Sequence, residues 1–203
     1  MLTYTKDKNG EDILLDSNNG QVMMEWEKPY MEACIDKLQP KGDVLEIGFG
    51  MGYSATHIQT YNPKSYTIIE CDPNVIERCK EWAKDYNNVT IIEAKWQEVI
   101  CTDKLSIYDE VFFDDFPNNL QTMSNLELFN IQHRVHLFLS FIQQYHLKKG
   151  SKLSAYICKN ESLYNDNIWK SKYIDNNSWK YYETIMDINT SNIQQYHKST
   201  NKA

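Results

Sequence analysis

The stretch Asp43–Gly52, which reads DVLEIGFGMG, joins a short apolar run to a tight cluster of glycines. The run DVLEI has the length and composition of a buried strand. Gly48, Gly50 and Gly52 then occupy alternate positions in a chain that has only seven glycines among 203 residues. Glycine adopts turn conformations that other residues avoid, and it lets the backbone pass close beneath a flat ligand. We therefore expect a strand that ends here in a ligand-binding turn.

Further strands and helices alternate along the chain after this turn. Short runs rich in Val, Ile, Tyr and Phe predict strands, and longer segments with apolar residues at helical spacing predict helices. The predicted strands are Tyr66–Glu70, Val89–Glu93, Glu110–Asp114, Lys152–Ile157 and Tyr181–Ile188. The predicted helices are Ser54–Thr60, a helix that begins at Asp72-Pro73, and Leu126–His146. This alternation predicts an α/β fold with a doubly wound, mostly parallel sheet and right-handed crossovers.

The residues before this core predict a helical cap. Residues 1–20 are polar and irregular, whereas the apolar residues between Val22 and Leu38 follow helical spacing. Pro29 suits the first turn of a second helix, where its missing N–H costs nothing. No repeat or linker divides the chain, so we expect one domain over residues 1–203. Its parts would be a cap at 1–40 and a Rossmann-like core at 41–203.

The composition narrows the class of protein. Hydrophobic residues make up 41% of the chain and charged residues 24%, which is typical of a globular domain. The formal net charge of −7 argues against a surface that binds nucleic acid or anionic lipid. The five scattered cysteines form no C-x-x-C pair, and the start lacks an apolar signal segment. We expect a cytoplasmic protein with no nucleic-acid or membrane partner, and its oligomeric state stays open.

An acidic residue follows the second predicted strand of the core. Ligands of doubly wound sheets bind beyond the carboxyl ends of the strands, where Glu70 lies 22 residues after Gly48. A carboxylate at that place can accept both hydroxyls of a ribose. Together, Glu70 and the spacing E-x-G-x-G-x-G that begins at Glu46 resemble the motifs of class I S-adenosylmethionine (SAM) methyltransferases. The resemblance implies SAM as cofactor and S-adenosylhomocysteine as product; without it, these residues would be a tight turn and a solvated acid.

Two further strand ends carry residues of interest. Trp96 follows the third core strand and is either a residue that packs against adenine or a tryptophan at the edge of the core. The segment Phe112–Pro117, FFDDFP, lacks the Asp/Asn-Pro-Pro-aromatic order of enzymes that methylate bases. Residues 158–160 are Cys-Lys-Asn and provide no acidic ligand, so we expect no metal. Asp114 is then a carboxylate that faces the methyl donor and suits a cationic acceptor.

A longer resemblance specifies that acceptor. The segments VMMEWEKPYM (Val22–Met31), VLEIGFGMG (Val44–Gly52), IIEC (Ile68–Cys71) and DDFP (Asp114–Pro117) resemble the guanidinoacetate N-methyltransferase family. The resemblance implies that Glu27 and Asp114 grip the guanidinium of a small guanidino substrate, and it places Lys159 near the far end of that substrate. The implied cofactor-binding positions, together with those of the glycine motif, are Met23, Met31, Glu46, Gly48, Phe49, Gly50, Met51, Gly52, Tyr53, Ser54, Glu70, Cys71, Asp72, Trp96 and Gln97.

The chemistry of a guanidinium agrees with two carboxylates. A guanidinium has a pKa above about 12, and the lone pairs of its nitrogens are delocalised. Two carboxylates can form charge-assisted hydrogen bonds that hold one nitrogen in line with a sulfonium methyl group. One of them must accept a proton as the C–N bond forms, and we assign that role to Asp114.

Departures from the family leave two alternatives open. The chain has no tryptophan before Trp26, whereas the family has one in its N-terminal lid, so either Tyr4 replaces it or the lid is reduced. The chain also has Phe113 and Phe116 where the family is rich in tyrosine. The family's Leu-Thr pair after the fifth core strand is replaced near Lys159. One alternative is an arginine N-methyltransferase that acts on a peptide or protein, as the fungal arginine methyltransferases resemble this family. The other is a SAM-binding module without catalysis.

Overall fold

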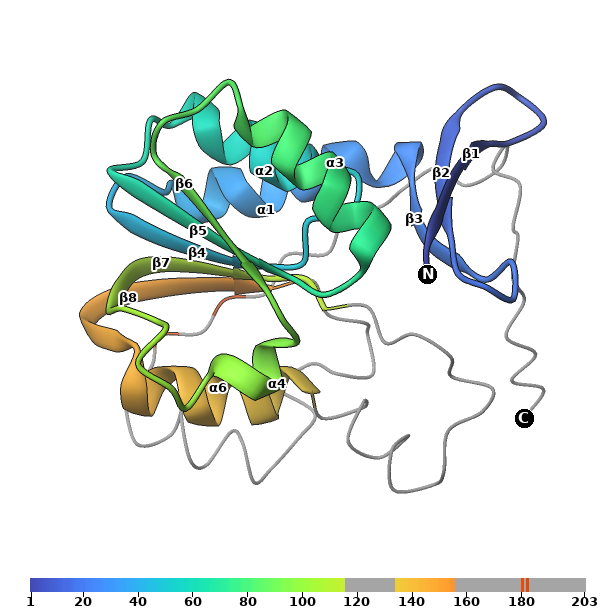
Figure 1. Ribbon diagram of the computed structural model, residues 1–203. Helices are drawn as coiled ribbons and strands as arrows, with labels where there is room; N and C mark the ends of the chain where they lie inside the picture. Colours follow the sequence, from blue (N-terminus) through green and yellow to red (C-terminus); the bar gives the residue numbers. More distant parts are fainter. Residues whose placement is uncertain (116–133, 156–179, 181, 183–203) are drawn as a thin grey trace.

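The computed structural model describes residues 1–115, 134–155, 180 and 182 (Figure 1). Lys159, the first part of the predicted helix Leu126–His146 and, apart from Tyr182, the predicted strand Tyr181–Ile188 lie outside these described residues. Among the helices of the described part, none has both the length and the apolar character needed to cross a membrane.

A parallel sheet of five strands forms the centre of the core (Figure 1). Its strands, in the order in which they lie side by side, are β6 (Val89–Glu93), β5 (Ser65–Glu70), β4 (Asp43–Ile47), β7 (Tyr108–Phe113) and β8 (Leu147–Ala155). All neighbouring pairs are parallel. The chain leaves β4 toward β5 and β6 and later returns on the other side of β4 as β7. The predicted doubly wound fold is therefore confirmed, and the carboxyl ends of β4, β5 and β7 meet at one edge, which is where such sheets bind ligands.

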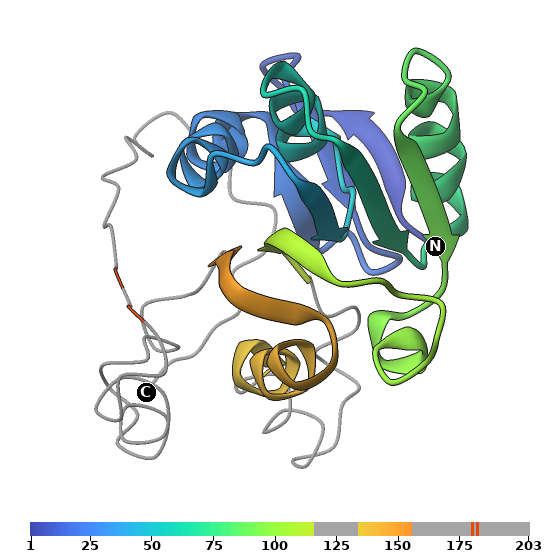
Figure 2. The same cartoon turned by 90° about the vertical axis from the view of Figure 1, so that its left-hand side faces the viewer.

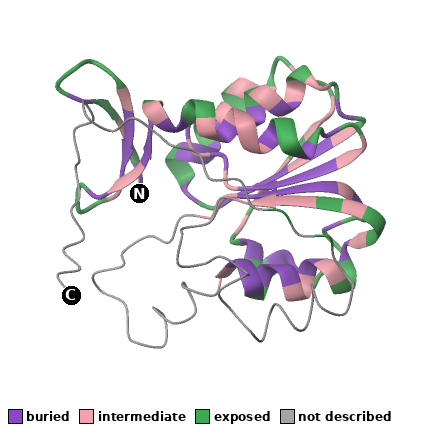
Figure 3. Ribbon diagram, turned by 180° about the vertical axis from the view of Figure 1, so that it is seen from behind, coloured by how far each residue is buried: buried purple, intermediate pink, exposed green. Residues whose placement is uncertain are grey.

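Helices cover both faces of this sheet (Figures 1 and 2). One face carries α1 (Lys28–Leu38), α2 (Tyr53–Thr60) and α3 (Pro73–Ala83), and the other carries α4 (Trp96–Val99) and α6 (Arg134–Tyr145). Phe112 packs with the first group of helices and its neighbour Phe113 with the second. Successive side chains of a strand point to opposite faces, so each strand contributes to both apolar clusters. Figure 3 shows the result as buried residues along the strands between the two helix layers.

Two predicted helix starts are confirmed. The Asp72 side chain accepts hydrogen bonds from the backbone N–H groups of Asn74 and Val75, at 3.0 and 3.3 Å, and Pro73 follows as the first residue of α3. Pro29 lies in the first turn of α1. Both starts depend on local chemistry: a short acceptor satisfies N–H groups that lack partners, and proline needs none.

The predicted helical cap is wrong in its first part. Residues 1–24 form an antiparallel three-stranded sheet of β1 (Thr3–Lys6), β2 (Asp12–Leu15) and β3 (Gln21–Met24). Val22 and Met23 lie in β3, and only the single turn η1 (Glu25–Glu27) separates β3 from α1. Asp7 and Asp16 each accept backbone N–H groups within their own turn, which closes the hairpins. The helical spacing after Val22 could not reveal β3, because its partner β2 supplies the hydrogen bonds and the burial.

Strand β8 begins earlier than predicted. We expected a strand at Lys152–Ile157 after a break at Lys149-Gly150, but β8 runs from Leu147 to Ala155 and includes the glycine. Its register against β7 shifts between Tyr108 and Glu110. Gly150 has a φ of +95°, which a glycine adopts without strain, so the irregularity interrupts the pairing without ending the strand.

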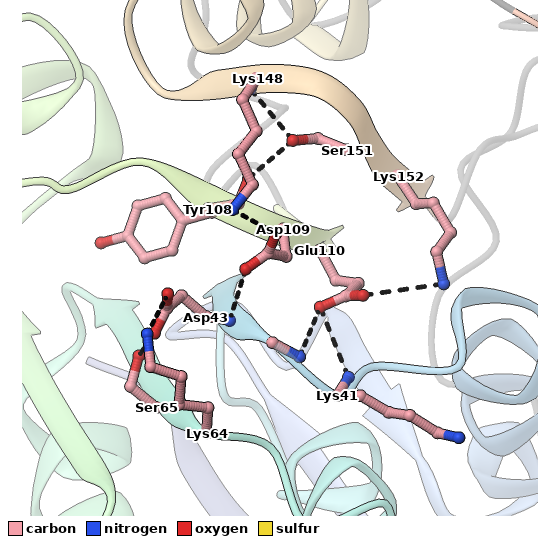
Figure 4. Close-up of polar contacts among 11 residues, drawn as sticks. Lys41, Asp43, Lys64, Ser65, Tyr108, Asp109, Glu110, Lys148, Ser151 and Lys152 are labelled. Atoms are coloured by element: carbon pink, nitrogen blue, oxygen red, sulfur yellow. Dashed lines mark hydrogen bonds and ion pairs between the residues drawn. The ribbon is translucent and has the colours of Figure 1, made fainter.

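Polar contacts fasten β4 to β7 at the edge opposite the carboxyl ends (Figure 4). The Asp109 carboxylate accepts the N–H of Asp43 at 3.1 Å. The Glu110 carboxylate accepts the N–H groups of Lys41 and Gly42, at 3.4 and 3.0 Å. A Cβ on Gly42 would lie 2.4 Å from the carboxylate of Asp109, so the glycine permits this close approach. These contacts fix the start of β4, and hence the position at which β4 ends.

Candidate active site

The glycine turn directly follows β4. Gly48, Gly50 and Gly52 have φ angles of +85°, +54° and +77°. Glycine adopts this left-handed conformation without strain, which confirms that the backbone of the turn explains the cluster. The N–H of Gly48 donates to the carbonyl of Ile69 on β5 at 2.9 Å. On the other side, a Cβ on Gly48 would lie 2.3 Å from the carbonyl oxygen of Asp114. The turn is therefore held between the ends of β5 and β7.

Glu70 anchors this turn to the end of β5. Its carboxylate accepts three backbone N–H groups: those of Phe49 at 2.9 Å, Cys71 at 2.7 Å and Asp72 at 2.9 Å. An ionised carboxylate offers about four acceptor sites, so capacity remains for a ribose hydroxyl. Glu70 is nearly buried beside the glycine turn, as a residue that binds a ribose there would have to be.

Glu46 lies beneath the turn within the sheet. It is fully buried, and its two carboxyl oxygens accept hydrogen bonds from the hydroxyls of Ser54 and Tyr66. Burial raises the pKa of Glu46 to about 8; the hydrogen bonds from Ser54 and Tyr66 oppose this rise, and the nearby charges of Asp114 and Glu70 add a smaller contribution to it. The hydrogen bond between Glu46 and Ser54 therefore joins the start of α2 to the sheet. Both side chains are hydrogen-bonded within the protein.

The N-terminal sheet covers the glycine turn (Figure 1). The Tyr4 hydroxyl donates to the carbonyl oxygen of Gly50 at 2.7 Å, and the N–H of Met51 donates to the sulfur of Met23 at 3.4 Å. The guanidinium of Arg78 lies 4.3 Å from the centre of the Tyr4 ring. Burial raises the pKa of Tyr4, which remains a neutral hydrogen-bond donor. Tyr4 thus occupies a position over the turn that suits its predicted role in place of a tryptophan.

Other predicted cofactor residues have varied surroundings. Phe49 is buried; its N–H donates to Glu70, and its ring centroid lies 5.4 Å from that of Trp82. Met31 is buried in the same apolar cluster. Tyr53 is half-buried, with the Lys28 ammonium group 5.9 Å from its ring centre. The side chains of these three residues therefore pack beneath the glycine turn more than they line its exposed side.

Trp96 has the surroundings of a tryptophan at the edge of the core. It is buried, and its ring packs against Phe113 and Phe138 with centroid distances of 5.9 and 5.3 Å. Its indole N–H donates to the carboxylate of Asp115 at 2.8 Å. Sequence reasoning missed this bond, because it depends on the proximity of α4 to the end of β7. Gln97 is exposed, as is Cys71, while the Asp72 side chain caps α3 and also accepts the N–H of Leu2 at 2.8 Å.

Glu27 and Asp114 approach one another at the same edge. Glu27 ends the turn η1; it is buried, and its Oε1 atom accepts the N–H of Met24 at 2.8 Å and the side-chain amide of Gln21 at 3.3 Å. Burial raises the pKa of Glu27 to about 7, and the negative charge of Asp114 contributes to the rise. Asp114 follows β7, and its N–H donates to the carbonyl of Ile47 at 3.0 Å.

The pKa of Asp114 is also raised, to about 6. Burial is the main cause; the charges of Asp115 and Glu70 add to it, and the guanidinium of Arg134 opposes it. Glu27 is buried and Asp114 half-buried, and two such acids near one another favour a cation between them, because a positive charge stabilises both ionised forms. Lys159, the third predicted substrate residue, lies outside the described residues. Within residues 1–115 and 134–155, no group of three or more His, Cys, Asp or Glu side chains could hold a metal ion.

Comparison with known proteins identifies the family of the chain. A model of the guanidinoacetate N-methyltransferase family matches residues 4–195. The chain belongs to this family. Its fold and its family are those of SAM-dependent methyltransferases. For SAM, the observation that fits is the donor set: a glycine turn followed by a carboxylate, Glu70, with acceptor capacity left for a ribose.

Curated relatives of this guanidinoacetate N-methyltransferase family member carry another name. Protein arginine N-methyltransferase 2 of Candida glabrata is 38% identical over 138 residues, which cover 63% of this chain and 33% of the relative. The protein of that name from Saccharomyces cerevisiae is 32% identical over 124 residues, which cover 56% and 30%. The chain therefore spans about a third of the length of these relatives.

Among solved structures, the fold resembles a precorrin-6Y C5,15-methyltransferase from Geobacter metallireducens. The TM-score is 0.54 at 14% sequence identity, with 84% of this chain and 77% of that chain covered. At this identity the similarity shows a shared fold only.

Proposed function

We propose that this protein is a SAM-dependent N-methyltransferase whose acceptor is a guanidino group. The observation that carries the proposal is the proximity of two carboxyl groups, the buried Glu27 and the half-buried Asp114, beside the glycine turn, close enough for the charge of Asp114 to act on Glu27. Each has a raised pKa, about 7 for Glu27 and about 6 for Asp114, and each is near the charge of other acids. Such a pair needs a cation to be fully ionised at neutral pH, and a guanidinium is a planar cation with donors on several sides.

The two carboxylates would orient the acceptor. Glu27 and Asp114 approach from different elements, η1 and the end of β7, so they can hold two sides of one guanidinium and fix its plane. Holding one nitrogen in line with the donor methyl group lowers the activation free energy, because the entropy of orienting the two reactants is lost on binding and not in the transfer step. Bound SAM would supply the methyl group from its sulfonium sulfur.

Asp114 is proposed as the proton acceptor. As the new C–N bond forms, the attacking nitrogen must lose a proton, and a carboxylate within hydrogen-bond reach can accept it. Burial raises the pKa of Asp114 to about 6, which makes its carboxylate a stronger base than an exposed aspartate. Glu27 keeps the guanidinium in place while this happens.

The acceptor that carries the guanidino group has two candidates. The family model supports a small compound such as guanidinoacetate. The curated relatives, which are named protein arginine N-methyltransferase 2 and are 38% and 32% identical, favour an arginine within a protein. Both acceptors present the same cation to Glu27 and Asp114, so the two carboxylates cannot distinguish them.

A methyl-transfer assay tests the proposal. The purified protein receives SAM with a labelled methyl group and, in separate reactions, guanidinoacetate, arginine, agmatine and arginine-containing peptides. We expect labelled product with at least one of them. SAM binding without transfer to any of them would contradict the proposal and favour a non-catalytic SAM-binding module.

Three variants separate the roles of the residues. Asp114→Asn should bind SAM normally and lose at least about 100-fold in kcat, because it cannot accept the proton. Glu27→Gln should raise the acceptor KM. The matched control is Glu25→Gln, which removes the same charge from an exposed position of the same turn and should leave both constants unchanged. Wild-type kcat in Asp114→Asn would refute the assigned role.

A further inference from the structure

Ser154 lies near the proposed acceptor site on the last described strand. It occupies β8 opposite Phe112 of β7, and Asp114 follows Phe112 by two residues. From strand geometry, the Cα atoms of Ser154 and Asp114 are about 8 Å apart. Residues paired across a parallel sheet share a face, and Phe112 packs on the side of α1. The side chain of Ser154 therefore points toward α1, beneath the end of β7.

Helix α1 presents a polar stripe to the same place. Glu27, the N-cap of α1, precedes Tyr30 by three residues, and Cys34 follows Tyr30 by four, which places all three on one side of the helix. The hydroxyls of Tyr30 and Ser154 both lie near enough to the thiol of Cys34 to affect its pKa. The negative charge of Asp114 contributes to the raised pKa of both Glu27 and Cys34, so Asp114 lies near both ends of the stripe.

The proton of the Ser154 hydroxyl already has a partner. Ser154 Oγ donates to the backbone carbonyl of Cys34 at 3.2 Å. A hydroxyl has one proton and two lone pairs, so a serine that donates to a carbonyl turns its lone pairs elsewhere. Burial raises the pKa of Cys34 to about 11, so its thiol stays neutral and can at most donate weakly to one lone pair of the serine, which leaves the other lone pair available. Ser154 is thus oriented to accept a hydrogen bond.

A guanidinium has more N–H donors than the two carboxylates can accept when they lie in its plane. A monosubstituted guanidinium carries five N–H groups, and a carboxylate that meets one of its edges takes two of them. Glu27 Oε1 is already bonded to Met24 and Gln21, which leaves Oε2 for the acceptor among the described contacts. With two N–H groups on Asp114 and one on Glu27, two remain. A buried N–H without a partner costs about 1–3 kcal/mol, so the site needs another acceptor.

We propose that Ser154 is a substrate-binding residue whose hydroxyl oxygen accepts an N–H of the guanidinium, with its orientation fixed by the carbonyl of Cys34. This inference rests on the proposed function and extends it to a residue on β8. It makes Ser154 a determinant of acceptor affinity, and not of SAM affinity, because β8 lies on the side of β7 away from β4 and β5.

The simpler reading is that Ser154 only fastens β8 to α1. Ser151 provides a matched control for it, since it lies on the same strand and its hydroxyl also donates to a carbonyl, that of Tyr108 at 2.7 Å (Figure 4). Ser151 lies three residues before Ser154, about 10 Å further from the carboxyl ends of the strands. If the hydroxyl of Ser154 serves stability alone, Ser154→Ala and Ser151→Ala should behave alike.

The test compares kinetic constants and binding. With the guanidino acceptor that the wild-type protein methylates, Ser154→Ala should raise the acceptor KM about tenfold, in keeping with one lost hydrogen bond to a charged group. Its SAM dissociation constant should stay within twofold of wild type. Ser154→Thr keeps the hydroxyl and should restore the acceptor KM, and Ser151→Ala should leave it unchanged. Titration calorimetry of the acceptor with the S-adenosylhomocysteine-bound protein should show the same order of affinities.

The outcomes separate this inference from the function on which it rests. A wild-type protein that neither binds nor methylates any guanidino compound refutes both. A wild-type protein that methylates a guanidino compound, together with a Ser154→Ala variant of unchanged acceptor KM and binding, refutes the role of Ser154 alone. A raised KM in Ser151→Ala equal to that of Ser154→Ala also refutes it, because the effect would then come from a general loosening of β8.

Discussion

Replacing Gly48 by alanine should damage the site more than it damages the fold. Gly48 has a φ of +85°, and the Cβ of an alanine would lie 2.3 Å from the carbonyl oxygen of Asp114. Real Cβ atoms essentially never approach another atom closer than 3.0 Å, so the backbone of Asp114 or the turn must move by about 0.7 Å or more. The proposed proton acceptor would move with it.

The expected magnitudes follow from these two effects. The left-handed conformation costs an alanine about 1–2 kcal/mol. Separating Asp114 from the turn also strains the hydrogen bond from its N–H to Ile47, which is 3.0 Å long and adds about 1 kcal/mol when lost. We expect Gly48→Ala to lower the free energy of unfolding by about 2–3 kcal/mol. A misplacement approaching 1 Å costs up to about 100-fold in rate, so kcat should fall by tens-fold or more.

Gly150→Ala is the matched control. Gly150 also has a left-handed φ, +95°, but a Cβ there would meet nothing within 4 Å. It should therefore cost only the conformational term of about 1–2 kcal/mol and leave kcat unchanged. Urea denaturation gives the two stabilities, and the methyl-transfer assay gives the two rates. Equal stability losses in the two variants, with wild-type kcat in Gly48→Ala, would refute the close approach of Asp114 as the reason for the glycine.

Buried ionisable groups lead to three more predictions. The pKa values of Glu27 and Asp114 are about 7 and 6, and both groups must ionise to bind a cation. The value of kcat/KM for a guanidino acceptor should therefore rise up to about pH 7 and then level off. A flat profile from pH 5 to 8 would contradict this. Glu46 has a pKa of about 8 against an ordinary 4.5, so the folded protein holds a proton that the unfolded chain releases. The free energy of unfolding should then fall between about pH 4.5 and 8, and Glu46→Gln should show a smaller fall in denaturant titrations at pH 5 and pH 8; an equal fall would exclude Glu46 as its source. Both ring nitrogens of His146 lie within hydrogen-bond distance of backbone carbonyl oxygens, at 2.9 and 2.6 Å. His146→Phe should therefore lower the free energy of unfolding by about 2–4 kcal/mol, as measured by thermal or chemical denaturation. An unchanged stability would show that these contacts do not form.

Some elements could be predicted because their causes are local. Asp72-Pro73 begins α3 through bonds to the next two residues, and the turn after β4 needs glycines because of its own φ angles. Other elements could not. The apolar spacing from Val22 suits a helix, but β3 forms there because β2 lies beside it, and the Asp7 and Asp16 turns that bring the strands together are weak signals in the sequence.

The candidate site divides in the same way. The sequence marks Glu70 and Asp114 by their positions at strand ends, since parallel strands bring their carboxyl ends to one edge. It marks Glu27 only through the resemblance to a family, because a glutamate two residues before a proline has no local feature that separates it from an exposed helix residue. Ser154 and the bond from Trp96 to Asp115 carry no signal at all in the sequence. They depend on which strand or helix lies beside β7.

The sequence alone thus determined the alternation of strands and helices, the glycine turn and the acid that follows β5. Those features depend on residues within a few positions of each other, where propensity, capping and turn chemistry decide. Only the tertiary structure decided that the N-terminal residues form a sheet over the turn, with the Tyr4 hydroxyl bonded to Gly50. It also decided that Glu27 lies close enough to Asp114 for their charges to interact. Burial and charge interactions act through space, so the raised pKa values of those two carboxyl groups exist only once distant segments have packed together.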